Sequence, residues 1–250
     1  MQTFDSEGVR IAFTDEGDGA PIVLIHGFAS SVKDNWLNPG WIGFLARNGF
    51  RVVAIDNRGH GQSEKLYDPN CYGAPSMAED ARRLLDHLGI ARADVMGYSM
   101  GARIATFLLL AHPERVRSAI LAGVGINLVR GMVGSGPIAK ALEAPRIEDV
   151  TNDTARSFRA FAEKTGSDLK ALAACMRGPR EKILAEDLAR IGIPVLVATG
   201  SEDVIAGSGQ DLASLIPGAQ LLEITGRDHM KAVGDARFRQ GVLDFLTERP

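Results

Sequence analysis

The stretch Asp94-Val95-Met96-Gly97-Tyr98-Ser99-Met100-Gly101 joins an apolar, strand-like run to a segment with helical character. Its last five residues match the pattern Gly-x-Ser-x-Gly, in which glycines flank a serine. A tight strand-to-helix turn brings neighbouring backbones close together, so side chains at its flanks would clash. The turn lifts the Ser99 hydroxyl above the sheet edge, beside the free N–H groups and positive dipole end of the following helix. This context predicts that Ser99 is a nucleophile and not an ordinary turn serine.

Short β-branched runs alternate with longer helical patterns on both sides of this turn. Continuous apolar strands indicate burial on both faces, as in a parallel sheet covered by helices. Phe4 to Asp15 resembles an antiparallel hairpin at one edge, and Ser76 is expected to cap a helix. Further helices are expected from Gly101 to Ala111 and from Phe238 to Leu246. The strand-like runs lie at residues 21–25, 51–55, 94–96, 118–122, 194–198 and 220–224.

One long stretch breaks this alternation. From about Gly123 to Arg190 there is no convincing strand, and apolar residues recur at spacings of three or four. We therefore predict one core domain formed by residues 1–123 and 191–250, with residues 124–190 inserted as a helical cap.

An activated serine needs a histidine to take its proton and an acid to orient that histidine. Among five histidines, His229 alone lies in a loop after the last strand, at the end where ligands bind in doubly wound sheets. Asp203 follows the fifth strand and falls between Ser99 and His229 in chain order, with Glu202 as the adjacent alternative. The predicted catalytic residues are therefore Ser99, Asp203 and His229.

An oxyanion hole requires two N–H donors, because a tetrahedral intermediate concentrates negative charge on one oxygen. The backbone N–H of Met100, directly after the nucleophile, is one candidate. The loop after the first parallel strand supplies the other, the backbone N–H of Phe28 in His26-Gly27-Phe28.

Taken together, these motifs resemble the α/β-hydrolase superfamily over nearly the whole chain. They are His26-Gly27-Phe28, Asp56-Asn57-Arg58-Gly59-His60-Gly61-Gln62-Ser63, Gly97-Tyr98-Ser99-Met100-Gly101, Gly200-Ser201-Glu202-Asp203 and Asp228-His229. The resemblance implies an α/β fold: a mostly parallel open sheet of about eight strands, helices on both faces and a helical cap. The single glycine after His26 resembles the esterase, enol-lactonase, perhydrolase and C–C hydrolase branches. Serine at the turn argues against haloalkane dehalogenases and epoxide hydrolases, which use aspartate there.

The composition limits which classes of partner and cofactor are expected. The 250 residues carry a net charge of −3, which does not favour nucleic acid or an anionic membrane surface. Cys71 and Cys175 form no metal-ligand cluster, so neither a metal nor a cofactor is expected. The acidic N-terminal residues lack an apolar signal segment, so we expect a cytoplasmic protein. Oligomeric state is not readable from the sequence.

Substrate choice is expected to depend on the cap. We predict a carboxylic-ester hydrolase for small to medium, fairly apolar acyl esters, including polyesters as a possible polymeric substrate. C–C bond hydrolysis, enol-lactone opening and a hydrolase-fold ligand receptor are the alternatives. Arg103, one helical turn beyond Ser99, is expected to form a surface salt bridge in preference to touching an acidic substrate. Candidate pocket residues are Trp36, Leu128, Val129, Met132, Phe158, Phe161 and Met176, although packing is the favoured role for Trp36 and the alternative for the cap residues.

Overall fold

A single eight-stranded sheet forms the centre of the molecule. The structure is a computed structural model that describes residues 1–131 and 135–248. The strands lie in the order β1-β2-β4-β3-β5-β6-β7-β8, with β1/β2 and β2/β4 antiparallel and the remaining pairs parallel. This arrangement confirms the predicted α/β-hydrolase fold. The strands are β1 (Gln2–Ser6), β2 (Val9–Glu16), β3 (Ala20–Ile25), β4 (Phe50–Ile55), β5 (Ala93–Tyr98), β6 (Val116–Ala122), β7 (Val195–Gly200) and β8 (Gln220–Ile224).

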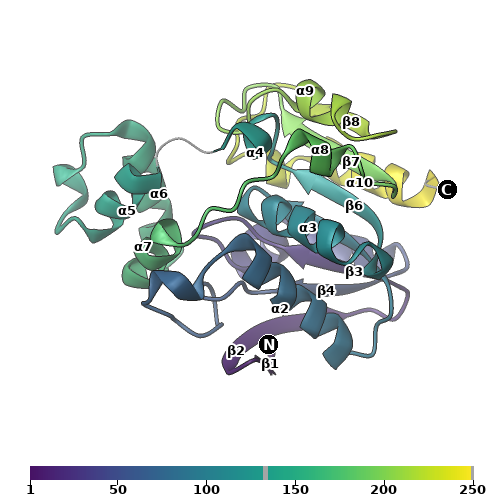
Figure 1. Cartoon of the computed structure of the whole chain (residues 1–250), viewed down its shortest axis with the longest axis horizontal. Coiled ribbons are helices and arrows are strands. Elements are labelled where there is room, and N and C mark those ends of the chain that lie inside the picture. The colour runs from purple at the N-terminus through teal and green to yellow at the C-terminus, as the bar shows by residue number, and fades with distance from the viewer. Residues whose placement is uncertain (132–134, 249–250) are drawn as a thin grey trace.

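Helices cover both faces of this sheet (Figure 1). Because successive strand residues point to opposite faces, Val23 and Ile25 pack in one core cluster and Ile22 and Leu24 in the other. The first cluster includes α2 (Ala74–His87) and α3 (Met100–Ala111); the second includes α1 (Trp41–Arg47) and α10 (Ala236–Glu248). The other α-helices are α4 (Asn127–Arg130), α5 (Ser135–Glu143), α6 (Asp153–Lys164), α7 (Leu169–Arg177), α8 (Ala185–Leu188) and α9 (Gly209–Ser214). Single-turn helices lie at Lys33–Leu37, Pro69–Cys71, Pro113–Arg115, Ile147–Asp149 and Ala232–Gly234.

Helix α2 begins two residues before the expected cap. Ser76 lies inside the helix, and Gly73 occupies the position before its first residue. Pro75 stands in the first turn, where its missing N–H has no partner to lose and its fixed φ suits a helix. Among the residues that the structure describes, no helix combines the length and apolarity needed to cross a bilayer.

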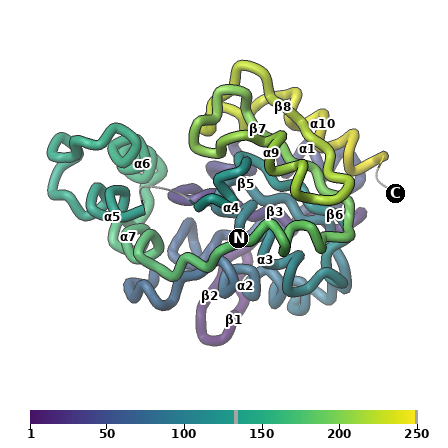
Figure 2. Tube along the Cα trace, turned by 45° about the horizontal axis from the view of Figure 1, so that its top comes forward, coloured from purple at the N-terminus to yellow at the C-terminus, as the bar shows by residue number. Residues whose placement is uncertain are grey.

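The segment between β6 and β7 contains helices α4 to α8, and the parts of it that the structure describes contain no strand. Figures 1 and 2 show α5, α6 and α7 as a lobe to one side of the sheet, which we call the helical lobe. It rests on the loop after β3, where the rings of Phe158 and Phe28 lie 6.0 Å apart. Nearby, the Thr165 hydroxyl donates to the carbonyl of Ala29 at 3.0 Å. The lobe is therefore positioned over the carboxyl ends of the strands.

A very close backbone contact shapes the turn between β5 and α3. A Cβ added at Gly101 would lie 1.9 Å from the carbonyl oxygen of Ile25, and one added at Gly97 would lie 2.2 Å from the carbonyl oxygen of Gly101. No side chain fits at either position. Ser99, between them, has φ 56° and ψ −114°, a conformation that L residues rarely adopt. The tight approach of α3 to β3 thus holds a strained serine at the end of β5.

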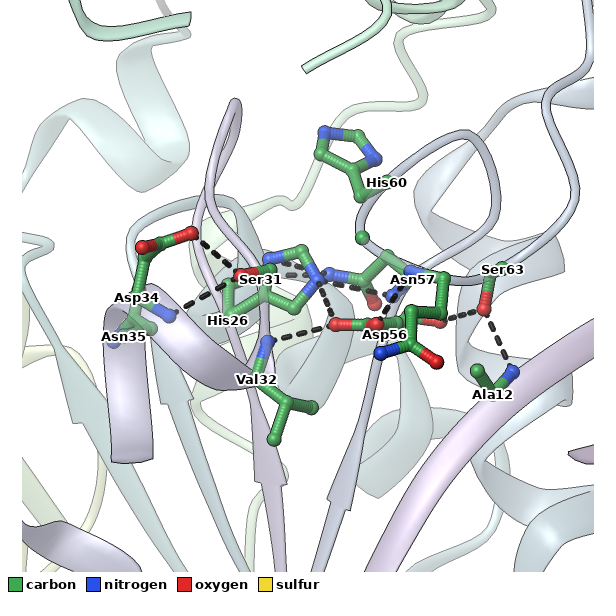
Figure 3. A network of polar contacts seen from close by, with 12 residues as sticks. Ala12, His26, Ser31, Val32, Asp34, Asn35, Asp56, Asn57, His60 and Ser63 are labelled. Carbon is green, nitrogen blue, oxygen red and sulfur yellow. Dashed lines mark hydrogen bonds and ion pairs between the residues drawn. The ribbon is translucent and has the colours of Figure 1, made fainter. Parts of the chain in front are cut away.

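A buried polar network joins the loops that follow β3 and β4 (Figure 3). His26 Nδ1 lies 2.7 Å from the carbonyl of Gly27, and its Nε2 lies 3.0 Å from the backbone N–H of Asn57. Those partners require a neutral ring that donates from Nδ1 and accepts at Nε2. Burial lowers the pKa of His26 to about 4 and that of His60, also fully buried, to about 3. Both rings are therefore neutral in the folded protein at neutral pH.

The contact at Gly101 leads to a first prediction. Gly101→Ala should lower the free energy of unfolding by about 2–3 kcal/mol, because backbone atoms must move to admit the methyl group. Urea denaturation followed by circular dichroism measures the change. Gly136→Ala is the matched control, since no atom of the described residues lies within 4 Å of a Cβ there and alanine favours helix. Equal stability of the two variants would contradict the proposed packing constraint.

The buried histidines lead to a second prediction. Their pKa values are lower in the folded than in the unfolded chain, so the unfolded chain binds more protons below pH 6.5 and stability falls as pH decreases towards 4. His60→Gln should reduce the loss of unfolding free energy between pH 7 and pH 4.5 by roughly 2–3 kcal/mol. Urea denaturation of wild type and variant at both pH values isolates the effect of His60. The carboxylates contribute equally to the pH dependence of both proteins, so their contribution cancels in the difference. The exposed His87, changed to Gln, is the control and should keep the wild-type pH dependence.

Candidate active site

Three side chains from the carboxyl ends of different strands meet in a hydrogen-bonded series. The Ser99 Oγ lies 2.9 Å from His229 Nε2, and His229 Nδ1 lies 2.7 Å from Asp203 Oδ2. Ser99 follows β5, Asp203 follows β7, and His229 follows β8. The parallel register brings these strand ends to one edge, although 130 positions separate the serine from the histidine. The structure thus brings together the three residues that the sequence analysis selected.

The carboxylate of Asp203 is fixed on both of its oxygens. Oδ1 accepts the backbone N–H groups of Ile205 and Ala206, at 3.0 and 2.9 Å, which leaves Oδ2 aimed at the imidazole. Glu202 is exposed and takes no part in this contact. Asp228, beside the histidine in sequence, instead forms an ion pair with Lys231 at 2.9 Å. Asp203 is accordingly the acid positioned to hold His229 with its proton on Nδ1.

Tyr98 adds a contact that the sequence motifs did not indicate. Its hydroxyl donates to the carbonyl oxygen of His229 at 2.7 Å, and the two rings lie 5.8 Å apart. The residue before the nucleophile therefore also holds the backbone of the histidine loop. The x position of Gly-x-Ser-x-Gly carries no restriction in the motif, so only the fold reveals this link.

Two backbone N–H groups are available beside Ser99. Met100 is the first residue of α3, where N–H groups have no partner within the helix. Phe28 follows Gly27, whose carbonyl oxygen faces His26 Nδ1 at 2.7 Å. In a trans peptide the N–H points opposite to the carbonyl, so holding the Gly27 oxygen also fixes the direction of the Phe28 N–H. Both Phe28 and Met100 line the cavity that contains Ser99 and His229.

A cavity of about 510 Å³ opens above the serine, within the usual size range for small-molecule sites. Four of the predicted pocket residues line it: Leu128, Val129, Phe158 and Met176. Two others do not. Phe161 is half-buried and packs against the core, while Met132 lies outside the described residues.

Trp36 also lies away from the cavity. It is fully buried in the core cluster on the α1 and α10 face, 6.1 Å from the ring of Trp41 in an edge-to-face arrangement. Its large apolar surface is thus satisfied by packing under the sheet. The prediction that Trp36 borders the substrate pocket is corrected accordingly.

Arg103 lies in the wall of the cavity, whereas the sequence predicted a surface salt bridge for it. Among the described residues it forms no ion pair; its guanidinium instead lines the cavity and donates to the backbone carbonyls of Leu128 and Glu181. The expected surface salt bridge is absent because the carbonyls of α4 and of the segment before α8 surround this position of α3. Arg103 therefore belongs to the cavity wall.

Comparisons with known proteins agree with this architecture. A sequence profile of the alpha/beta hydrolase fold matches residues 20–137. A 2-hydroxymuconate semialdehyde hydrolase from Pseudomonas putida is 30% identical, over 96% of this chain and 92% of its own length.

Solved structures extend the similarity to nearly every residue. An enol-lactonase from Burkholderia xenovorans LB400 superposes with a TM-score of 0.82 and 25% identity, covering 99% of this chain and all of its own. The esterase RhEst1 from Rhodococcus sp. ECU1013 gives a TM-score of 0.80 and 25% identity, covering 99% of this chain and 98% of its own. With a shared fold and a relative that is similar over nearly its full length, the chain belongs to the α/β-hydrolase superfamily.

Proposed function

We propose that this protein is a serine-dependent hydrolase of carboxylic esters that acts through an acyl-enzyme. The observation that carries the proposal is the unbroken series Asp203–His229–Ser99, which opens onto the cavity beside two available N–H donors. Each part has the position that acyl transfer requires: a nucleophile in contact with a base, and a base held by an acid. The similarity to an esterase of known structure supports the same reaction class.

The acylation half follows from these positions. His229 Nε2 takes the proton of the Ser99 hydroxyl as Oγ attacks the ester carbonyl carbon. The tetrahedral oxyanion accepts hydrogen bonds from the N–H groups of Phe28 and Met100. Asp203 stabilises the imidazolium, which then gives its proton to the departing alkoxide as the C–O bond breaks. The acyl group remains on Ser99.

The deacylation half reverses the roles. His229 removes a proton from a water molecule, which attacks the acyl carbon and forms a second tetrahedral intermediate in the same N–H cradle. Collapse of that intermediate breaks the bond to Ser99 Oγ, and the imidazolium returns the proton to the serine. Every proton transfer uses a group of this chain or water.

A second candidate is cleavage of a C–C bond or of an enol-lactone. The similarity to the Pseudomonas putida hydrolase and to the Burkholderia enol-lactonase favours it. The same serine, histidine and N–H donors would act, but the leaving atom would be a carbon or an enol oxygen. A substrate panel of simple esters, enol-lactones and vinylogous diketones separates the two. A ligand receptor, the third alternative, would bind tightly but turn over far more slowly than an ordinary enzyme.

Ser99→Ala provides the third prediction. Removal of the hydroxyl should lower kcat for p-nitrophenyl acetate and butyrate by roughly 10⁴-fold or more, because no acyl acceptor remains. Thermal unfolding verifies that the variant is folded. The exposed Ser214, changed to Ala, is the matched control and should keep the wild-type rate. Undiminished hydrolysis by Ser99→Ala would exclude the acyl-enzyme mechanism.

The acid provides the fourth prediction. In Asp203→Asn, an amide N–H₂ would face His229 Nδ1, forcing the ring proton onto Nε2 and removing the base that faces Ser99. We expect kcat to fall about 10⁴-fold with the fold retained. Glu202→Gln, one residue away and exposed, should remain within twofold of wild type. If the two variants lose activity equally, Asp203 is not the orienting acid.

A further inference from the structure

The cavity wall carries an excess of positive charge that the proposed reaction does not use. Four of its lining residues are cations, namely Arg103, Arg130, Arg180 and Lys182, whereas Glu181 is the one carboxylate among its described lining residues. None of these four cations forms an ion pair within residues 1–131 and 135–248. An apolar acyl group alone would leave this charge without a partner.

Arg103 is the most enclosed of these cations. It is half-buried, and its guanidinium carbon lies 5.4 Å from the centre of the Phe107 ring. Among the described residues, its guanidinium donates to the neutral carbonyls of Leu128 and Glu181, which engage only part of its five N–H donors. Burial, followed by the nearby charge of Arg180, lowers the pKa of Arg103. An anion bound here would offset the cost of burying the guanidinium and its repulsion by Arg180, because a charge-assisted hydrogen bond is stronger than one to a neutral group.

Glu181 compensates the cluster only in part: its charge raises the pKa of Arg103, but burial and Arg180 outweigh it, and it forms no ion pair with these cations among the described residues. Its carboxylate lies beside Gly73, the residue before α2, where a Cβ added to that glycine would be 3.4 Å from Oε1. The contact with Arg103 uses the backbone carbonyl of Glu181, not its side chain. The Oε2 atom is buried without a hydrogen-bond partner. The carboxylate thus turns towards α2 and leaves the guanidinium facing the cavity.

The position of Arg103 relative to Ser99 indicates which part of a substrate it would meet. Four residues along α3 correspond to about 6 Å of rise, and the guanidinium of Arg103 lies over the ring of Phe107, one further turn along the helix. The guanidinium therefore lies in the cavity wall away from the reacting carbonyl, where the far end of a short acyl chain attached to Ser99 could reach it. The leaving group must instead reach His229, which protonates it.

We propose that Arg103, with Arg180 beside it, binds a carboxylate at the far end of the acyl chain, so that the preferred substrates are monoesters of short dicarboxylic acids. This inference rests on the proposed ester hydrolysis and specifies its substrate class. A planar guanidinium matches the geometry of a carboxylate, and apolar side chains such as Leu128 and Phe158 would contact the methylene groups between the two ends.

The fifth prediction compares two esters with the same leaving group and a five-carbon acyl chain, mono-p-nitrophenyl glutarate and p-nitrophenyl pentanoate. Wild type should show at least a tenfold higher kcat/KM for the glutarate ester, and added NaCl should reduce that preference. Arg103→Met and Arg180→Met should each lower the preference at least fivefold, mainly by raising KM for the glutarate ester. Arg177→Met, on α7 and paired with Glu143 outside the cavity, is the matched control and should keep the preference.

Arg180→Met is the second variant in case Arg103→Met does not fold. Arg180 is exposed, so its substitution should leave the fold intact. Equal kcat/KM values for the two esters in wild type, or an equal loss for both esters in the two arginine variants, would overturn the proposal.

Calorimetric titration of Ser99→Ala with glutarate separates this inference from the proposed function. Glutarate binding that is at least tenfold weaker when Arg103→Met is added would support the subsite even if no ester were hydrolysed. Hydrolysis of both esters without a preference would leave the ester hydrolase in place and reject the subsite.

Discussion

The approach of α3 to β3 at Gly101 is the constraint on which the site depends. The carbonyl of Ile25 occupies the space of a Cβ at this glycine, so the helix can start directly above the sheet edge. That start forces Ser99 into a positive φ and places the unpaired N–H of Met100 beside its hydroxyl. A single backbone contact therefore positions both the nucleophile and one oxyanion donor. The backbone, and not the packing of a flexible side chain, sets both positions.

The rest of the site is supplied by neighbouring strand ends and is held mostly through backbone atoms. Tyr98 fixes the carbonyl of His229, and the N–H groups of Ile205 and Ala206 fix Asp203. His26 fixes the peptide that carries the Phe28 N–H. Because its Nε2 accepts the N–H of Asn57, the neutral ring carries its proton on Nδ1, which donates to the Gly27 carbonyl. Its deep burial keeps the ring neutral, so the same feature that makes the fold sensitive to acid also orients an oxyanion donor at neutral pH.

The sequence could predict those features that depend on local pattern and chain order. Apolar runs located the six parallel strands, and the glycine-flanked serine with a downstream acid and histidine located Ser99, Asp203 and His229. It could not predict features decided by tertiary neighbours. A tryptophan near the first loop is compatible with a pocket wall and with a core; packing was the favoured role, and the contacts of Trp36 with Trp41 and its core cluster agree with it. Likewise, an arginine on a helix surface is expected to form an ion pair with a carboxylate. Only the structure shows that Arg103 instead donates to the carbonyls of Leu128 and Glu181.

The location of Arg103 also bears on where specificity resides in this fold. Substrate choice was expected to come mainly from the helical segment between β6 and β7. Yet Arg103 belongs to α3 and bonds to the backbone at both ends of that segment, at Leu128 and Glu181. These carbonyls persist whatever side chains the segment carries, so the position of the guanidinium is set by the core and by backbone geometry. The helical lobe can then vary the apolar part of the cavity while the charge stays one helical turn from the nucleophile.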